Sequence, residues 1–450
     1  MRNQITDALK GRKADYIEIR IEENKSARLV YRGKRLEEVG RTSSVGGNVR
    51  ALVKGGWGFV SFNDIHNLKD NVDLAIKEAK LTGKEGFELS PIEPVIDIVK
   101  PEEKDRSLTL ASKKQLLDDY NDIILSTPKI QTSSIGYSDG QKKTTFTSSE
   151  GTYIEQTRDD INLRLTAIAS EKGEVQQMGL SIGSPGDFSA LQDLQQQAKQ
   201  IAERAAALLA APQAKGGEYT VVLDPVLAGV FAHEAFGHLS EADHVYENER
   251  LKEIMVLGRK FGGKHLNIVD GAAVPGFRGS YKYDDEGVRA TKTYLIHDGI
   301  LESRLHSRET AAKMGEKTTG NARAINYSFP PIVRMTNTYI EPGTLSFEDI
   351  IADIKEGIYA RDWYGGTTSL EMFTFSAAEA YMIRNGKIAE LLRPVVLSGN
   401  VFATLSNIDA IGNDLEMNQG GGCGKRGQMP LPVSNGSPHI RISRCLVGGS

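Results

Sequence analysis

The chain has 450 residues, of which 39% are hydrophobic, 25% charged and 7% aromatic. This composition is typical of a globular protein and excludes a largely disordered or membrane-embedded one. The net charge is −4, from 55 basic and 59 acidic residues, and no run of five or more basic residues occurs. The sequence therefore offers no electrostatic surface for nucleic acid or for an anionic membrane, and we expect neither as a partner.

Two further features bear on the compartment. The first twenty residues carry charges throughout and contain no apolar core of the kind that a secretory signal needs. No stretch approaches the roughly 18 apolar residues of a membrane-spanning helix. The two cysteines, Cys423 and Cys445, are too few for a disulfide framework. We therefore expect a cytoplasmic protein.

Length and patterning predict an α+β fold with two domains, because 450 residues exceed what one ordinary core holds. The first domain, residues 1–212, combines short alternating runs with amphipathic stretches, which indicates an α/β sandwich-like arrangement. We expect short strands within 16–64 and 130–170, helices over 67–82, 112–126 and 188–211, and a connecting segment over 89–107.

The second domain, residues 213–450, follows a boundary near 212–217, where Pro212 and a pair of glycines end the last helical pattern. Its many short alternating runs predict a mostly antiparallel β domain with a curled, barrel-like sheet. Helical patterns are few in this domain and are expected over 225–238, 242–261 and 345–359.

The helix expected from residue 225 carries the residues with the clearest chemistry. Asp224 and Pro225 are a favoured N-cap and first helical residue, and His233, Glu234 and His238 follow in the same apolar segment. Imidazole nitrogens bind zinc, and a neighbouring carboxylate can act as general base towards water on the metal. The i, i+5 spacing sets the two histidines roughly 140° apart on a regular α-helix. Both can bind one ion only if the helix ends between them or widens into a π-like turn.

Other residues around this motif support the same interpretation less directly. Gly237, immediately before His238, permits a departure from regular helical geometry. Glu241 and Asp243 follow a few residues later. They either orient a ligand imidazole through its second nitrogen or belong to a solvated helix face.

A third ligand has to come from another part of the chain. Cys423 lies in the glycine-rich run NQGGGCGKRGQ, where the backbone can approach a metal closely and zinc would hold the thiol as a thiolate. The alternative for Cys423 is a small apolar residue in a tight turn. The sequence leaves as further candidates Cys445, His244, His306, His439 and the acidic residues.

The motif around His233 is the first of several distinctive stretches in the second domain. These are HEAFGHLSEAD (233–243), YDDEGVRA (283–290), PPIVRMTNTYIEPG (330–343), IKEGIYA (354–360) and IGNDLEMNQGGGCGKRGQMPLPVSNGSPHIRI (411–442). In this order they resemble the TldD half of the TldD/PmbA (TldE) metallopeptidases. The resemblance implies that His233, His238 and Cys423 bind zinc and that Glu234 is the general base, as in the active half of that family.

The resemblance also implies an activity and a partner. It implies a cytoplasmic zinc metallopeptidase that hydrolyses unfolded or small peptides, in which Glu234 activates the zinc-bound water. The expected partner is a PmbA/TldE-like chain in a heterodimer, or else a second copy in a homo-oligomer. Two other functions are a peptide-binding, non-catalytic subunit and a zinc amidase or deacylase on small amides. The presence of all four site residues argues against the first of these.

Overall fold

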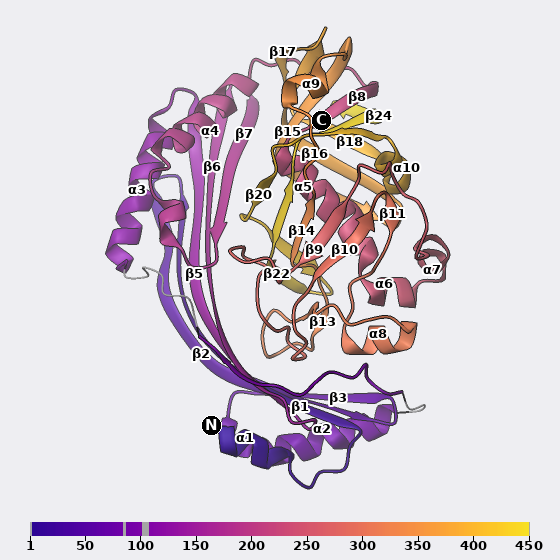
Figure 1. Cartoon of the computed structure of the whole chain (residues 1–450). Coiled ribbons are helices and arrows are strands. Elements are labelled where there is room, and N and C mark those ends of the chain that lie inside the picture. Colours follow the sequence, from indigo (N-terminus) through magenta and orange to yellow (C-terminus); the bar gives the residue numbers. More distant parts are fainter. Residues whose placement is uncertain (1, 84–86, 101–107, 450) are drawn as a thin grey trace.

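The computed structural model describes residues 2–83, 87–100 and 108–449, and its architecture is the α+β one that the sequence predicts (Figure 1). The chain first forms a long arched sheet with helices near both of its ends. It then forms a β-rich part that lies beside the arch. The prediction of helices packed on a sheet, followed by a mostly antiparallel barrel-like part, is confirmed.

Seven strands of the described chain form the arched sheet. They are β1 (Tyr16–Arg32), β2 (Arg35–Val53), β3 (Gly56–Phe62), β4 (Ile96–Val99), β5 (Ile130–Ser148), β6 (Tyr153–Glu171) and β7 (Glu174–Ser184). Their order is β3-β2-β1-β5-β6-β4, and β7 pairs with β6. Neighbours are antiparallel except β4 and β6, which run parallel.

The strands β1, β2, β5 and β6 are much longer than the sequence predicts. Residues 16–64 were expected to form several short strands, yet β1 and β2 are each continuous. The polar stretch around Asn24 stays extended because both of its backbone edges are paired, with Ser44 of β2 and Lys142 of β5 opposite. The expectation of short strands is therefore wrong, because long-range pairing satisfies the backbone groups of a stretch whose composition does not by itself favour a strand.

Helices cover the arched sheet near its two ends (Figure 1). They are α1 (Arg2–Leu9), α2 (Leu68–Thr82), α3 (Leu110–Ser126) and α4 (Gln195–Leu208). Helices α1 and α2 share one hydrophobic core with the start of β1, and α3 and α4 share another with β5 and β6. The predicted helices over 67–82 and 112–126 are confirmed.

The helix predicted over 188–211 is shorter than expected. A 3-10 turn at Phe188–Leu191 precedes α4, and Asp193 between them has a φ of +57°, which no right-handed helix accommodates. Of the connecting segment predicted over 89–107, residues 101–107 lie outside the described residues. The short strand β4 lies in the remainder.

A closed barrel forms the centre of the second part. Its strands and their neighbours are β8 (Gly217–Leu223), β15 (Glu356–Ser369), β16 (Met372–Arg384), β17 (Lys387–Leu392), β18 (Val395–Asn400), β19 (Ile408–Ile411) and β24 (Ile440–Gly449). Five of these described strands close a ring in the order β15-β8-β24-β18-β16, because β16 also pairs with β15. Only the β8–β15 contact of this ring is parallel.

A smaller sheet and two hairpin-like pairs accompany the barrel. The sheet contains β9 (Ile268–Gly271), β10 (Lys292–His297), β11 (Ile300–Leu301), β14 (Asn337–Ile340), β20 (Glu416–Asn418) and β23 (Ser434–Ser437). The pairs are β12 (Ala322–Arg323) with β13 (Ile332–Val333), and β21 (Gly422–Lys425) with β22 (Gln428–Pro432). Most buried apolar residues of the barrel and of the smaller sheet belong to one hydrophobic core.

The helices of the second part are short. They are α5 (Pro225–Phe231), α6 (Ala242–Glu247), α7 (Glu249–Ile254), α8 (Arg308–Met314), α9 (Phe347–Ile351) and α10 (Val401–Ser406). Helix α5 contacts β15 of the barrel as well as β20 and β23 of the smaller sheet. The helix predicted over 242–261 is divided at Asn248, which caps α7, and the one predicted over 345–359 ends early because β15 joins the barrel from Glu356.

Buried ion pairs join the arched sheet to the second part. Arg20 of β1 lies 3.2 Å from Asp285, and Arg50 of β2 lies 2.7 Å from Glu286. All four side chains are almost completely buried. Removing one partner of such a pair leaves an uncompensated buried charge and costs about 3–5 kcal/mol. The stretch 283–290, which the sequence singled out, therefore holds the two parts in a fixed relation.

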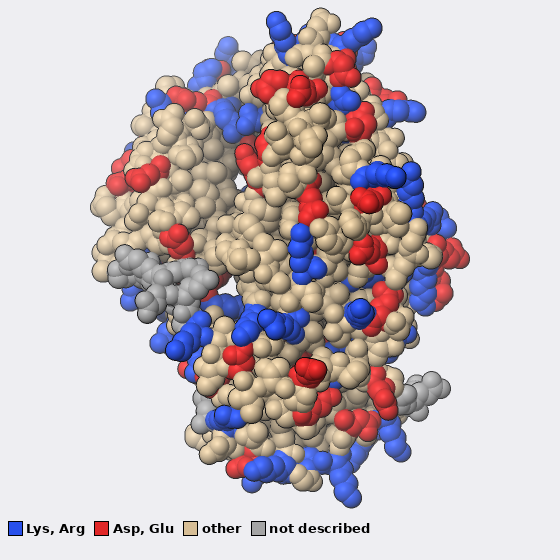
Figure 2. All heavy atoms as spheres, viewed as in Figure 1, with Lys and Arg blue, Asp and Glu red and all other residues tan. Residues whose placement is uncertain are grey.

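The surface carries charges of both signs. Basic and acidic side chains are interspersed over the face shown in Figure 2, which is hollowed where the arch meets the second part. Among the described helices, none is long and apolar enough to cross a bilayer.

Candidate metal centre

The two histidines lie where a short α-helix widens into a π-helical turn. The Asp224 carboxylate accepts a hydrogen bond from the backbone N–H of Leu227 at 2.9 Å, and Pro225 is the first residue of α5. The helix therefore begins where the sequence predicts. From Ala232 to Gly237 the backbone is π-helical, and the His238 N–H donates to the His233 carbonyl, five residues earlier. The two imidazoles, five residues apart, therefore lie side by side in an edge-to-face arrangement, with ring centroids 5.4 Å apart. The predicted widened turn is confirmed.

Gly237 matters to this turn through its size. The π-helical turn ends at Gly237, but its φ of −57° and ψ of −48° are ordinary helical values that any residue adopts. A Cβ atom at this position would lie 2.0 Å from Sδ of Met335. Glycine therefore allows Met335 to pack directly on the backbone beside His238.

A hairpin from a distant part of the chain brings Cys423 to the two histidines. Cys423 lies on β21 and is 1% exposed. Its Sγ is 3.5 Å from Nε2 of His238, and one donor atom from each of Cys423, His233 and His238 lies within 4.8 Å of the others. Within the described chain this is the one cluster of at least three such donors.

The separation of Cys423 and His238 suits a tetrahedral zinc ion. Bond lengths of about 2.0–2.1 Å to nitrogen and about 2.3 Å to sulfur place the two atoms about 3.6 Å apart at a tetrahedral angle. The 3.5 Å between Cys423 Sγ and His238 Nε2 agrees with this separation. Two imidazoles and a thiolate are ligands that zinc prefers, and three protein ligands leave a fourth position open.

Glu234 lies beside these donors with an accessible carboxylate. One of its oxygens is 4.0 Å from Nε2 of His233 and the other is 3.8 Å from Nε2 of His238. These distances are too long for close hydrogen bonds, so the carboxylate is not engaged by either ring. The Glu234 side chain is 34% exposed, whereas that of His233 is 2% exposed. Glu234 can therefore reach a molecule in the open position.

Each donor changes the proton affinity of the others. Burial alone would raise the pKa of the Cys423 thiol, but the imidazoles of His233 and His238 hold that pKa well below its usual range. Burial likewise opposes a charged His233, but the neighbouring thiolate raises the pKa of that ring. The surroundings of Cys423 thus favour the thiolate, which is the form that metals bind.

A buried carboxylate fixes the orientation of His238. Glu241 is completely buried and accepts a hydrogen bond from Nδ1 of His238 at 2.9 Å, which leaves Nε2 available to a metal. Lys425 places its Nζ 3.1 Å from the same carboxylate and donates to both oxygens of Asp243, at 2.7 and 2.8 Å. Burial opposes ionisation of Glu241, but Lys425 and His238 keep its pKa far below the usual range.

The sequence left the roles of Glu241 and Asp243 open, and the structure separates them. Glu241 contacts a candidate ligand, whereas Asp243 binds Lys425. The role of Lys425 was not foreseen, although its position two residues after Cys423 on a strand is the signal that could have indicated it. His233 lacks such support, because within the described residues its buried Nδ1 has no hydrogen-bond partner.

Replacing Lys425 by Met should weaken zinc binding and destabilise the fold. The change leaves the Glu241 and Asp243 carboxylates buried without a cation, which costs about 3–5 kcal/mol. It also loosens the group that orients His238, for which we expect about 10- to 100-fold weaker zinc binding. Competition with a chelating dye measures the affinity. The double variant with Asp243→Asn should regain part of the stability, and unchanged zinc affinity in Lys425→Met would contradict the role given to the lysine.

The N-cap carboxyl of α5 titrates in an unusual range. Burial, together with the nearby Asp362 carboxylate, raises the pKa of Asp224 to about 7, from an unperturbed value of 3.8. Between these two pH values the folded chain binds more protons at Asp224 than the unfolded chain. The free energy of unfolding therefore falls as the pH rises through this window, and this contribution is lost above it.

Replacing Asp224 by Asn should remove this pH dependence. The amide oxygen still accepts the Leu227 N–H at the cap, but no charge has to be buried. At pH 8 we expect the variant to unfold about 1 °C above the wild type, which corresponds to about 1 kcal/mol for a chain of 450 residues, and at pH 5 the difference should shrink. Thermal unfolding across this range tests the expectation. A variant that is less stable than the wild type at pH 8 would contradict it.

The other ligand candidates from the sequence lie apart from the three donors. Cys445 is buried in β24, His306 contacts Glu316, His439 contacts Asp414, and His244 places Nδ1 3.3 Å from the His238 carbonyl. None of these four joins the cluster of Cys423 with the two histidines.

Comparison with known protein families agrees with this geometry. Residues 216–449 match the model described as the PmbA/TldA metallopeptidase C-terminal domain. Residues 17–81 match domain 1 of the same family and residues 103–209 match its central domain. The chain belongs to the PmbA/TldD metallopeptidase family. All four candidate site residues lie within the C-terminal match of this PmbA/TldD member.

Curated PmbA/TldD relatives carry corresponding names. A protein of Synechocystis named a metalloprotease is 48% identical over 440 residues, which cover 97% of this chain and 95% of the relative. A protein of Saccharolobus solfataricus named a zinc metalloprotease TldD homolog is 35% identical over 325 residues, which cover 72% of each chain. These relatives support a metal-dependent protease.

Solved structures show the same fold. The crystal structure of a putative modulator of a DNA gyrase from Thermotoga maritima has a TM-score of 0.79 and 20% identity, and the match covers both chains completely. The crystal structure of TldE from Thermococcus kodakarensis has a TM-score of 0.77 and 19% identity, again over both chains. The PmbA/TldD architecture is therefore shared over the whole length of the chain.

Proposed function

We propose that this protein is a zinc-dependent metallopeptidase that hydrolyses peptide bonds of unfolded or small peptides. The proposal rests on the meeting of His233, His238 and Cys423 from two distant segments, with the accessible Glu234 carboxylate beside them. Structural zinc sites are closed by four protein ligands, whereas catalytic sites use three and keep one position for water or substrate. The three donors and the neighbouring carboxylate support the catalytic alternative.

In the proposed mechanism Glu234 is the general base. Zinc, when bound, polarises the scissile carbonyl and lowers the pKa of water at the site. Glu234 accepts a proton from the attacking water on a carboxylate oxygen and then donates it to the leaving amine nitrogen. Its exposure suits contact with substrate, while the buried Glu241 holds the His238 ring in place.

The proposal extends to substrate, partner and location. An extended peptide bound through its backbone would be recognised with little sequence preference. We propose that the chain acts together with a PmbA/TldE-like chain or with a second copy of itself. A cytoplasmic location suits Cys423 and Cys445, both of which are buried free thiols.

A zinc amidase or deacylase acting on small amides would use the same four residues. The two activities differ in their dependence on substrate length, because only a peptidase gains from backbone contacts away from the cleaved bond. A non-catalytic subunit has no need for a carboxylate such as Glu234 beside three metal donors.

Metal removal tests the proposed function. The purified protein should hold about one zinc per chain and cleave a denatured polypeptide. Dialysis against a chelator should abolish cleavage, and added zinc should restore it. Hexapeptides should be cleaved much faster than acetylated single-residue amides. Cleavage by the metal-free protein would contradict the zinc mechanism, and equal rates on both substrates would favour the amidase.

A further inference from the structure

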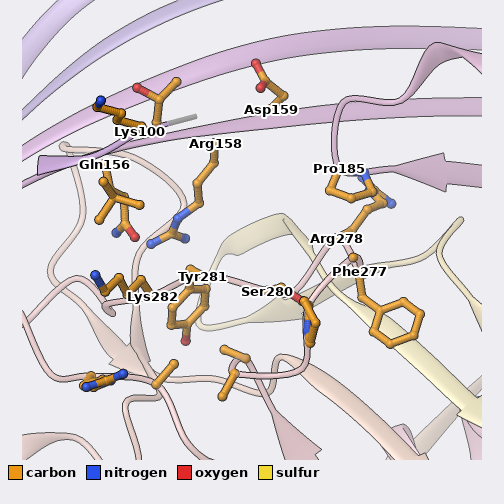
Figure 3. A pocket seen from close by; sticks show the side chains of 18 residues that line it. Lys100, Gln156, Arg158, Asp159, Pro185, Phe277, Arg278, Ser280, Tyr281 and Lys282 are labelled. Carbon is orange, nitrogen blue, oxygen red and sulfur yellow. The ribbon is translucent and has the colours of Figure 1, made fainter. Parts of the chain in front are cut away.

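A cavity lies where the arched sheet meets the second part. It has a volume of about 370 Å³ and is lined by β6, by Val99 and Lys100 at the end of β4, and by the loop of residues 272–290 (Figure 3). None of the four candidate site residues lines it. The cavity is therefore separate from the metal centre, and nothing in the proposed mechanism uses it.

The lining of this cavity is strongly cationic. Asp159 is the one acidic residue among the described residues that line it, and it accepts a hydrogen bond from Gln141. Its carboxylate points away from the side chain of Arg158, the preceding residue on β6 (Figure 3). The basic residues of the lining are Lys100, Arg158, Arg278, Lys282 and Arg289.

Two of these cations are already neutralised by carboxylates. Lys282 lies 2.5 Å from an oxygen of Asp97. Arg278 binds Asp160 through two hydrogen bonds, at 2.6 and 2.9 Å. The positive charge that no carboxylate balances therefore lies on the other basic side chains of the lining.

Three basic residues remain, Lys100, Arg158 and Arg289, and the two arginines have the planar group that suits a carboxylate. The Asp285 oxygen near Arg158 is 4.0 Å away, and the same carboxylate already pairs with Arg20 at 3.2 Å. Nε of Arg158 is buried and has no hydrogen-bond partner within the described residues. Arg289 is exposed and forms no hydrogen bond or ion pair in the part of the chain that the structure describes. Nη2 of Arg158 donates to the carbonyl oxygen of Tyr283 at 3.1 Å, which leaves Nη1 for a ligand. Both side chains can therefore bind an anion.

The remaining lining favours an organic anion over a small inorganic one. The Arg158 guanidinium lies over the ring of Tyr281, 4.3 Å from its centroid, and Phe277 and Pro185 also line the cavity (Figure 3). A guanidinium stacked on an aromatic ring is suited to planar carboxylates. The apolar side chains of the lining favour contact with carbon atoms of a ligand. The ligand that fits therefore carries a carboxylate and an apolar group.

The cavity is connected to the metal centre through the loop before Cys423. Arg278 donates to the carbonyl oxygens of Gln419 and Gly421, at 2.6 and 2.8 Å. Gly421 is two residues from Cys423, and an extended chain spans at most about 3.6 Å per residue, so this wall lies within about 15 Å of the thiol. A peptide of about five residues is long enough to span the distance between this wall and the thiol.

We propose that this cavity binds the C-terminal residue of a peptide substrate, with Arg158 and Arg289 holding its carboxylate. The inference rests on the proposed peptidase function and adds an anchoring point to it. Peptides held in this way are cleaved a few residues before their C-terminus. An acidic side chain within a peptide carries the same chemistry, and the test separates the two sources.

Binding is measured on zinc-loaded protein with Glu234→Gln, so that the peptide stays intact. Three fluorescent hexapeptides with an apolar last residue are compared: the free acid, its amide, and an amide with one internal Glu. We expect the free acid to bind at least about tenfold more tightly than either amide, as the loss of a charge-assisted hydrogen bond implies. Arg289→Gln and Arg158→Met should each remove about this factor for the free acid and leave the amides unchanged.

Two controls keep the result specific. Lys264→Gln removes an exposed lysine that does not line the cavity and should change nothing. Arg289 is exposed, so its replacement tests the proposal even if Arg158→Met impairs folding. Equal binding of acid and amide would overturn the proposal, and tight binding of the amide with internal Glu would overturn the C-terminal assignment. Selective binding of the free acid by a protein that cleaves no peptide would reject the peptidase function and retain the anion site.

Discussion

Replacing Glu234 by Gln should lower peptide cleavage by about 10²- to 10⁴-fold while the zinc content stays unchanged. The amide keeps the shape of the side chain but cannot accept the proton of the attacking water. Its distances of 3.8 and 4.0 Å from the histidine nitrogens place Glu234 beside the donors without making it one of them. Initial rates on a quenched fluorescent peptide, together with metal analysis of the same sample, measure both quantities.

The matched control for this variant is Glu241→Gln. Glu241 lies behind His238 and has no access to substrate, so its replacement should act on zinc affinity through the orientation of the ring. With zinc added in excess, Glu241→Gln should regain activity and Glu234→Gln should not. If Glu234→Gln kept more than a tenth of the wild-type rate, another group would have to be the base.

Replacing Cys423 by Ser should remove most of the bound zinc. The neutral hydroxyl is a poor zinc ligand, and two imidazoles alone hold the ion weakly. We expect zinc to bind more than about 100-fold more weakly. A factor of about 100 is the upper range for replacing a residue that supports a metal ligand without binding the metal itself. Equilibrium dialysis against a zinc buffer, followed by elemental analysis, measures the loss.

Cys445 provides the control for this experiment. It is also a buried free thiol, but it packs in β24, and burial raises its pKa to about 12. Cys445→Ser should therefore keep its zinc. Full zinc occupancy in Cys423→Ser, or zinc loss in Cys445→Ser, would move the third ligand away from Cys423.

The geometry of the histidine pair could be predicted from the sequence because it is local. Two imidazoles five residues apart cannot share an ion on a regular helix, so the requirement for a wide turn follows from helix geometry alone. The structure satisfies that requirement between Ala232 and Gly237. The close contact of Gly237 with Met335 was not predicted, since it depends on tertiary packing that no local pattern reveals.

The third donor could not be derived in the same way. Cys423 is 185 residues from His238, and its local surroundings suit a tight turn as well as a metal ligand. Its selection from the sequence came from the family resemblance. Lys425 was missed for a related reason, because its partners Glu241 and Asp243 are reached only when the hairpin packs against the helix.

The long strands of the arched sheet could not be predicted from the local sequence either. The polar stretch near Asn24 has the composition of a turn, but strands on both sides pair with it and keep it extended. The helix start at Asp224 agreed with expectation, because an N-cap is set by neighbouring residues. Contacts between distant segments account for most of what the sequence did not predict.

X-ray absorption at the zinc edge tests the central claim most directly. If His233, His238 and Cys423 hold the metal, the wild-type protein should show one sulfur neighbour at about 2.3 Å and nitrogen or oxygen neighbours at about 2.0–2.1 Å. The sulfur neighbour should disappear in Cys423→Ser and remain in Cys445→Ser. A wild-type spectrum without sulfur, or with two or more sulfur neighbours, would contradict this ligand set.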